Sequence, residues 1–378
     1  MENPILFTPI ETPLLGLHIS ANAEMGEYFG TLLPTCFNDF GSEYRALRRA
    51  VALVDSNFRA LFSLSGPDRQ RYLNAVLTSN VRDLKAGQGT VGLLLTPQGH
   101  ILAEVETLAL ADRILAFSHG MVRDRTFSTL DKFIIMDDVT LEDWTPSTGT
   151  LDLLGPRAAE LISALAKVDI AAMPEAAHVE AKLGSIPCRI VRHTWVGHPA
   201  ATLVVAREQL SVLWQELAPR VRANGGLPAG MEALNSIRLE SGTAWFGQDY
   251  DDKNIPHETG LELSHISYEK GCYTGQEIVE RVRSRGHANR RLTGLQFLDG
   301  KAPAAGTKLL LLGDPAGKEA GQVTSAGFSP LVGRRIGMGA GFQRVLLHER
   351  VLAPSQVPLR IGPGIASLRC GDEAHRQD

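Results

Sequence analysis

Residues Lys270 to Glu277 read Lys-Gly-Cys-Tyr-Thr-Gly-Gln-Glu, the segment of this chain whose residue types most suggest chemistry. Gly271 and Gly275 allow the backbone to turn tightly and to come close to a ligand. Cys272 lies between them, and a cationic neighbour such as Lys270 favours the reactive thiolate form of a cysteine. The segment therefore predicts a functional thiol at Cys272, and the alternative is a glycine-rich loop whose cysteine is simply buried.

Three arginines alternate with other residues directly after this segment; they are Arg281, Arg283 and Arg285. If residues 278 to 285 form a strand, the three side chains project from one face of it. A row of guanidinium groups suits carboxylates or phosphates. The alternative is a solvated strand face whose charge is balanced by Glu277 and Glu280.

The elements that must position these residues follow from the spacing of apolar residues and turn signals. Helices are expected over 43–54, 68–77 and 122–133, and strands over 60–65, 92–96, 101–110, 113–118 and 139–143. Pro97–Gly99 and Ala111-Asp112 are expected to connect the strands 92–96, 101–110 and 113–118 as antiparallel hairpins. Residues 150 to 224 read as strand, helix, strand, strand, helix. Gly66-Pro67 and Gly155-Pro156 each end a strand before a helix, which indicates two related halves or, equally, two unrelated strand ends.

After about residue 290 the pattern changes to short apolar runs between Gly and Pro turns, which predicts a small all-β barrel. These runs cover 292–297, 308–312, 321–325 and 336–339. The expected organisation is an irregular N-terminal segment (1–42), a first domain (43–149), a second domain carrying the Cys272 loop (150–290), the barrel (291–355) and a tail (356–378). In the first segment Pro4, Pro9, Pro13 and Pro34 are interpreted as breakers of regular structure.

The composition limits the class of protein. The 378 residues are 44% hydrophobic and 21% charged, with a net charge of −4, so no basic excess indicates nucleic-acid binding. The four cysteines lie far apart, without CxxC or zinc-ligand spacing, so we expect a reducing compartment and no metal. No signal peptide and no apolar run of about 20 residues is found, so the expected location is cytoplasmic, without a membrane partner.

The octet Lys270–Glu277 resembles the signature of YgfZ-type proteins, with every fixed position matched. The chain is thereby identified as a member of the folate-binding, aminomethyltransferase-like family, which also includes the T-protein of glycine cleavage. Further similar stretches occur in the family's order between residues 43 and 352. They are Ser65–Asp68, Leu77–Val81, Leu95–Gly99, Arg238–Gly242, Asn254–Leu261, Gly321–Ser325 and Ser329-Pro330.

This resemblance implies an α+β fold, with two related α/β-sheet domains and a small C-terminal β-barrel arranged as a ring around a central channel. It also implies that tetrahydrofolate or another reduced folate is the cofactor. The arginine row would then suit the glutamyl tail of that folate. The residues expected to bind the cofactor are Lys270, Gly271, Cys272, Tyr273, Gly275, Gln276, Glu277, Arg238 and Arg283.

Two departures from the T-protein pattern bear on activity. Where the T-protein has an Asp-Asp pair after its glycine hairpin, this chain has Ala103-Glu104, and the stretch His193–His198 lacks the Glu of the T-protein's folate contact. Carboxylates at such positions orient the pterin and handle protons. Their loss predicts that aminomethyl transfer is absent.

The expected function is therefore a folate-binding protein that supports iron–sulfur cluster assembly or repair in [4Fe–4S] enzymes, including tRNA-modifying radical enzymes. Its expected partners are iron–sulfur client or assembly proteins. A cluster needs about four thiolates, so Cys272 would make only a transient contact. The alternatives are a folate-dependent aminomethyltransferase or related one-carbon transferase, and an interaction scaffold without the ligand.

Overall fold

The structure is a computed structural model, and it describes residues 9–286, 288–297, 302–310, 319–342 and 369–370. The chain forms two compact units, each assembled from two separate parts of the sequence. The first unit joins Met1–Gly92 to Ala103–Leu234, and the second joins Leu93–Leu102 to Asn235–Asp378. The domain boundaries expected at residues 149 and 290 do not coincide with this division and stay predictions. Most of the expected tail lies outside the described residues.

The N-terminal segment, which was expected to be irregular, forms a three-stranded sheet in the order β1-β3-β2. Its elements are β1 (Ile10–Glu11), α1 (Leu15–Ser20), β2 (Glu24–Tyr28) and β3 (Thr31–Cys36). Pro34 was interpreted as a breaker but lies inside β3, opposite Met25 and beside an irregularity in the register. Proline is tolerated at such irregular or edge positions, which explains the wrong expectation.

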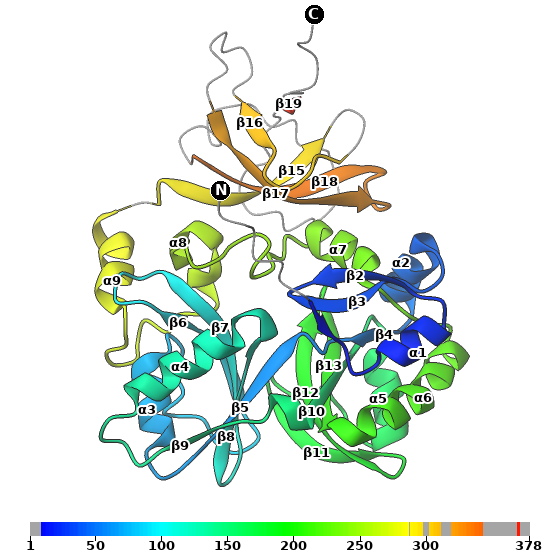
Figure 1. The fold of residues 1–378 in the computed structure, drawn as a ribbon, viewed down its shortest axis with the longest axis horizontal. Helices are drawn as coiled ribbons and strands as arrows, with labels where there is room; N and C mark the ends of the chain where they lie inside the picture. The colour runs from blue at the N-terminus through cyan, green and yellow to red at the C-terminus, as the bar shows by residue number, and fades with distance from the viewer. Residues whose placement is uncertain (1–8, 287, 298–301, 311–318, 343–368, 371–378) are drawn as a thin grey trace, which may run out of the picture. The chain divides into compact units, whose positions relative to one another are not determined.

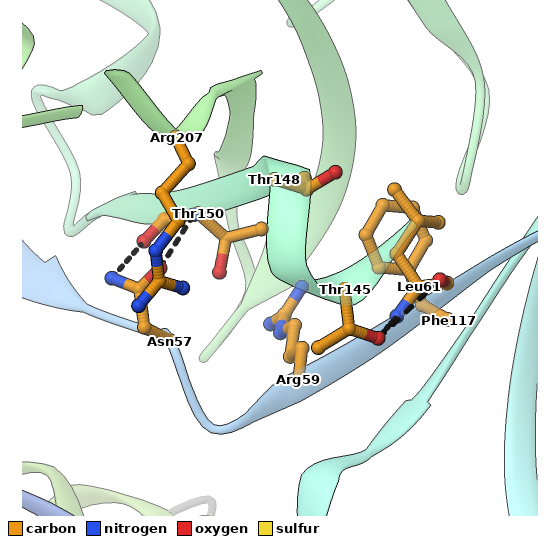
Figure 2. A pocket seen from close by; sticks show the side chains of 8 residues that line it. All are labelled: Asn57, Arg59, Leu61, Phe117, Thr145, Thr148, Thr150 and Arg207. Atoms are coloured by element: carbon orange, nitrogen blue, oxygen red, sulfur yellow. Dashed lines mark hydrogen bonds between the residues drawn. The ribbon is translucent and has the colours of Figure 1, made fainter. Parts of the chain in front are cut away.

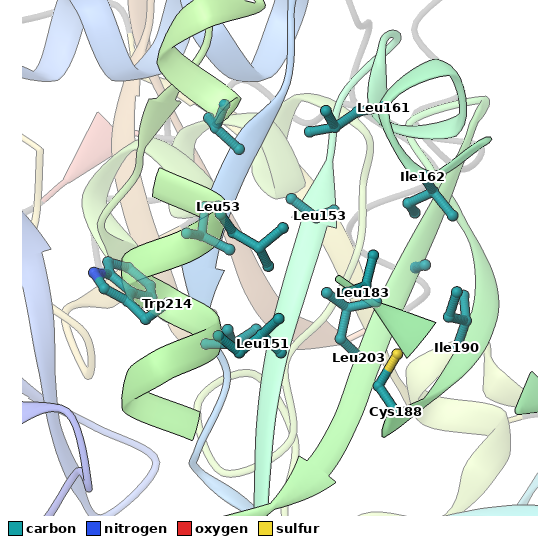
Figure 3. Close-up of a cluster of buried hydrophobic side chains, with 14 of the residues drawn as sticks. Leu53, Leu151, Leu153, Leu161, Ile162, Leu183, Cys188, Ile190, Leu203 and Trp214 are labelled. Atoms are coloured by element: carbon teal, nitrogen blue, oxygen red, sulfur yellow. The ribbon is translucent and has the colours of Figure 1, made fainter. Parts of the chain in front are cut away.

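The larger sheet of the first unit has the strand order β11-β12-β13-β10-β4-β14. Helices α5 and α6 pack on it, and Figure 3 shows the apolar cluster between them, including Leu53, Leu151, Leu203 and Trp214. The strands are β4 (Ala52–Asp55), β10 (Thr148–Leu154), β11 (His178–Leu183), β12 (Ile186–Trp195), β13 (His198–Ala206) and β14 (Leu227–Pro228). The helices are α2 (Phe40–Arg49), α5 (Ala158–Ala166) and α6 (Arg207–Ala223).

A second sheet has the order β6-β7-β8-β5-β9 and confirms the expected hairpins (Figure 1). Its strands are β5 (Arg59–Ser65), β6 (Gly89–Leu95), β7 (Ile101–Ala109), β8 (Arg113–His119) and β9 (Thr140–Asp143). Helices α3 (Arg69–Val76) and α4 (Arg123–Phe133) accompany them, with short 3-10 turns at η1 (Gly120–Val122) and η2 (Thr145–Ser147). The tip of the β6–β7 hairpin, residues 93–102, belongs to the second unit.

The second unit contains the expected C-terminal sheet, in the order β15-β18-β17-β16-β19. Its strands are β15 (Arg290–Phe297), β16 (Lys308–Leu310), β17 (Glu319–Ser329), β18 (Arg334–Phe342) and β19 (Arg369–Cys370). Its helical elements are α8 (Pro256–Thr259), η3 (Leu261–Leu263) and α9 (Gln276–Arg285), while α7 (Met231–Glu240) joins the two units. No helix of the described ranges is long and apolar enough to cross a membrane.

The strand expected over 278–285 is wrong, because these residues belong to helix α9. Glu277 and Arg281 pair at 2.9 Å across one helical turn, and Glu280 lies 3.5 Å from Arg283. Such pairs at spacings of three and four residues are typical of a helix. Because successive residues of a helix are rotated around its axis, Arg281 and Arg283 do not share a face, and the predicted arginine row does not form.

The core of the second unit encloses an ion pair. Arg238 and Asp249 have fully buried side chains and contact each other directly. Asp249 also accepts hydrogen bonds from Thr324 (2.7 Å), Ser325 (2.5 Å) and the backbone nitrogen of Trp245 (2.9 Å). The pair therefore fastens α7 and the turn after it to strand β17.

Replacing Asp249 with Ala should lower the free energy of unfolding by about 3–5 kcal/mol, because the guanidinium of Arg238 would stay buried without its counter-ion. Urea unfolding of the purified chain measures this change. Glu319→Ala is the control: Glu319 lies on β17, the strand that Asp249 contacts, in an exposed pair 3.8 Å from Lys308, and its loss should cost at most about 1 kcal/mol. Equal losses for the two variants would contradict the importance of the buried pair.

Candidate functional site

The second unit brings together three of the stretches noted in the sequence. The backbone nitrogen of Ile101 donates a hydrogen bond of 2.9 Å to the carbonyl of Asn254. At Gly275, where φ is +82°, a Cβ atom would lie 2.6 Å from the carbonyl oxygen of Thr96. The hairpin tip therefore packs against the Cys272 loop as closely as glycine allows, and the segment that begins at Asn254 meets the same hairpin.

The loop contains both buried and exposed residues. Lys270 and Tyr273 are buried, and the Nζ atom of Lys270 lies 5.1 Å from the centre of the Tyr273 ring. Burial raises the pKa of Tyr273, whose hydroxyl has no hydrogen-bond partner among the described residues. Gly271 and Cys272 are exposed, so the alternative of a buried Cys272 is wrong.

The other residues expected to bind the cofactor are dispersed. Gln276 and Glu277 begin α9, and Glu277 is exposed and paired with Arg281. Arg283 stacks on Tyr268, with its guanidinium carbon 4.0 Å from the ring centre, and lines a cavity of about 370 Å³. Arg238 is fully buried in the core. Its expected role in binding the cofactor stays a prediction.

A separate group of titratable residues lies in the first unit along strand β7. Ala103, Val105 and Thr107 are fully buried, whereas Glu104 and Glu106 alternate with them on the partly exposed face. An acid at position 103 would therefore point into the core. The carboxylates of Glu104 and Glu106, on the partly exposed face of β7, are present in this chain.

Two histidines lie close to these carboxylates. The Nε2 atom of His193, on β12, lies 3.7 Å from Oε1 of Glu106. Among the described residues, these two atoms and Nε1 of Trp195 are buried without a hydrogen-bond partner. Burial lowers the pKa of His119 to about 4, and Glu104 partly opposes this shift. Carboxylate and imidazole groups can accept and return protons.

A smaller pocket in the same unit, about 30 Å³ in volume, is too narrow for a folate. Figure 2 shows how its polar side chains close it: Asn57 donates to the carbonyl of Thr150 and accepts from the nitrogen of that residue. Arg59, which also lines the pocket, donates hydrogen bonds to Thr202 and Asp152. This pocket has the size of a single water site.

Sequence reasoning did not single out Glu106 or His119. Strict alternation over 101–109 would have assigned Glu104 and Glu106 to one face, and it would have assigned Ala103 to the other. No local sequence pattern indicated that His193 lies near Glu106, because β7 and β12 are far apart in the sequence. His193 itself belongs to the stretch in which the sequence lacked the expected Glu.

Comparisons with known proteins agree over most of the chain. Residues 14–266 match the family described as "GCVT N-terminal domain", and residues 290–341 match "Glycine cleavage T-protein C-terminal barrel domain". The aminomethyltransferase of Moorella thermoacetica is 26% identical over 87% of this chain and 88% of its own length. That of Thermus thermophilus is 26% identical over 93% of this chain and 95% of its own length.

The crystal structure of the glycine cleavage system aminomethyltransferase T from Bartonella henselae has the same fold. It superposes with a TM-score of 0.77 at 22% identity, covering 88% of this chain and 90% of that protein. The predicted mixed α/β class with a C-terminal barrel is confirmed.

The expected iron–sulfur assembly function is contradicted by these findings, because the relatives carry the name aminomethyltransferase. They favour the alternative of a folate-dependent aminomethyltransferase. The error has a physical reason: Ala103 was counted as a lost catalytic carboxylate, although its side chain lies in the core. The names of these relatives mention neither tRNA modification nor an iron–sulfur client.

His119 should make stability depend on pH. Its folded pKa is lowered to about 4, whereas an unfolded histidine titrates near 6.5. Keeping the ring neutral therefore stabilises the fold fully above about pH 6.5, and this contribution is lost as the pH falls towards 4. His119→Phe should reduce the drop in unfolding free energy between pH 7 and 4.5, whereas His198→Phe, at an exposed position, should not. An unchanged pH profile in His119→Phe would argue against this assignment.

Cys272 should react with iodoacetamide before Cys36 and Cys188. Its side chain is exposed, whereas burial raises the pKa of both other thiols to about 11 and so lowers their thiolate fraction at pH 8. Peptide mass spectrometry after short labelling times measures the order. The denatured chain is the control, in which the three thiols should react at similar rates. Earlier labelling of Cys188 in the folded chain would contradict the exposure of the loop.

Proposed function

The chain belongs to the GCVT N-terminal domain family, with a T-protein C-terminal barrel domain behind it, and from this premise we propose that it is a folate-dependent aminomethyltransferase or a related one-carbon transferase. The observation that carries the proposal is the cluster of Glu104, Glu106 and His193 on the open face of β7 and β12. A transferase that moves an aminomethyl or methylene group must accept and return protons at nitrogen. Carboxylate and imidazole groups supply this acid–base capacity.

The residues present fit a reduced folate, which is the cofactor expected for this family. The unpartnered atoms of Glu106, His193 and Trp195 include a hydrogen-bond acceptor and a hydrogen-bond donor. A pterin ring carries both donors and acceptors that can pair with them. Buried polar atoms without partners are costly, so a ligand that satisfies them gains affinity. When bound, tetrahydrofolate would supply the nitrogen atoms that accept the one-carbon unit.

Within this proposal Glu106 and His193 hold the folate and orient it, and Glu104 accepts the proton released during transfer. His119 is neutral at pH 7 because burial lowers its pKa, so it adds no positive charge near Glu104.

The Cys272 loop supports a finer proposal, membership in the YgfZ branch of the family. Its support is the complete octet and the exposed position of the thiol. We retain Lys270, Gly271, Cys272, Tyr273, Gly275, Gln276 and Glu277 as proposed ligand contacts. The cytoplasmic location likewise stays a prediction.

Glu104→Gln should lower the transfer rate by about 10²–10⁴-fold, because the amide keeps the size of the side chain but cannot accept a proton. The assay measures ammonia and methylene-tetrahydrofolate released from an aminomethyl-loaded lipoyl carrier in the presence of tetrahydrofolate. Glu142→Gln is the control, since Glu142 is exposed on β9 of the same sheet. It should keep the wild-type rate.

Folate affinity, measured by calorimetry, separates binding from chemistry. Glu106→Gln should weaken tetrahydrofolate binding, and Glu104→Gln should leave it nearly unchanged. A wild-type chain that binds tetrahydrofolate but releases neither product would contradict the proposed transferase. A chain that does not bind tetrahydrofolate would also contradict the proposal that a reduced folate is its cofactor.

A further inference from the structure

A cavity of about 370 Å³ in the second unit lies outside the acid–base cluster of the first. Its walls come from α8, η3, α9, the loop containing Tyr268 and the start of β15 (Figure 1). The volume falls within the range of roughly 300–1,000 Å³ that is typical of small-molecule sites. Apolar side chains supply one part of the lining, at Leu263, Val282 and Ala288, and charged groups supply the rest.

Glu262 is the most telling of these groups, because its side chain is buried and only half satisfied. One carboxylate oxygen, Oε1, accepts a hydrogen bond of 3.1 Å from Arg291. The other, Oε2, is buried and has no partner in the described part of the chain, although only 7% of the residue is exposed. A buried carboxyl oxygen without a hydrogen-bond partner is costly, so a ligand that donates a hydrogen bond to it gains affinity.

His257 adds a second unsatisfied group to the same cavity. Both of its ring nitrogens are buried and lack partners within the ranges that the structure describes. Burial lowers its pKa, so the ring is neutral at pH 7 and offers one donor and one acceptor. A ligand with polar hydrogens can therefore bond to both Glu262 and His257.

Arg283 supplies the opposite charge. Its guanidinium lies 4.0 Å from the centre of the Tyr268 ring, and its ion pair with Glu280 is long, at 3.5 Å. Stacking on an aromatic ring fixes the plane of a guanidinium and leaves its edges directed outward, where they can bind a carboxylate with two hydrogen bonds. About half of the Arg283 side chain is exposed, so a ligand can reach it.

We propose that this cavity binds the zwitterion of a small α-amino acid. The ammonium group donates to Oε2 of Glu262 and to His257, the carboxylate binds Arg283, and the side chain packs against Leu263, Val282 and Ala288. A purely anionic ligand, such as the glutamyl tail of a folate, would leave Glu262 unsatisfied, and a purely cationic one would not use Arg283. Because Glu262 with Arg291 and Glu280 with Arg283 balance in charge, a ligand of zero net charge fits.

The test uses calorimetry on the full chain with three amino acids of zero net charge: L-alanine, L-leucine and L-phenylalanine. At least one should bind, and its N-acetyl and carboxamide derivatives should each bind about tenfold more weakly or worse, since each loses one charged contact. No heat with any of the three probes overturns the proposal. Equal affinity for an N-acetyl derivative also overturns it, because the ammonium would then make no contact.

Variants locate the binding to this cavity. Arg283→Gln should weaken the best probe at least about tenfold, whereas Arg281→Gln, on the same helix but outside the cavity, should not change it. Glu262→Gln should have an effect similar to that of Arg283→Gln, and its melting temperature shows whether the buried change disturbs the fold. Unchanged binding in Arg283→Gln would place the amino acid elsewhere and overturn the proposal. These measurements involve no folate, so they do not depend on the proposed transferase activity.

Discussion

The buried pair of Arg238 and Asp249 is the interaction on which the second unit depends. It joins a helix, the turn that follows and a barrel strand at one point, and the side chains of both partners are fully buried. Two neighbouring hydrogen bonds join the same two elements, α7 and β17, along a line of contacts that we call the seam. Ser236 donates to the carbonyl of Phe328, and Ser329 donates to Glu240. Because a charge in a low-dielectric interior tolerates only a narrow geometry, this seam fixes where the strands start relative to α7. Strand β15, which carries Arg291, is held through β18 and β17 to the same seam.

The first unit uses buried acids in a comparable way. The carboxylate of Asp55 accepts from Thr12 at 2.6 Å and contacts His18 at 2.8 Å, and Glu43 accepts from the backbone nitrogens of Phe37 and Gly230. These contacts attach the N-terminal segment to the large sheet. In both units, therefore, an acidic side chain at the centre of several donors connects stretches that are distant in the sequence.

The sequence predicted those elements whose residues repeat with one clear period. The hairpins around 97–99 and 111–112 and the barrel strands were of this kind, and the structure confirms them. Residues 276–285 fit two periods at once, since the arginines alternate while Ile278 and Val282 recur four apart, and the wrong period was chosen. The first 42 residues were misread because their prolines outweighed weak strand signals. Contacts such as that between Glu106 and His193, or the enclosure of Glu262, arise only from tertiary packing and leave no local pattern.

The hairpin tip at residues 93–102 gives the molecule an interleaved order of assembly. The second unit is not continuous in sequence, since its first ten residues precede Asn235 by more than 130 positions. During synthesis at about 5–20 residues per second, Ile101 waits on the order of ten seconds for Asn254 to emerge. Contacts of such long sequence separation slow folding. A fragment that begins at Asn235 would also lack the turn against which Gly275 packs, so the two units cannot be separated by one cut of the chain.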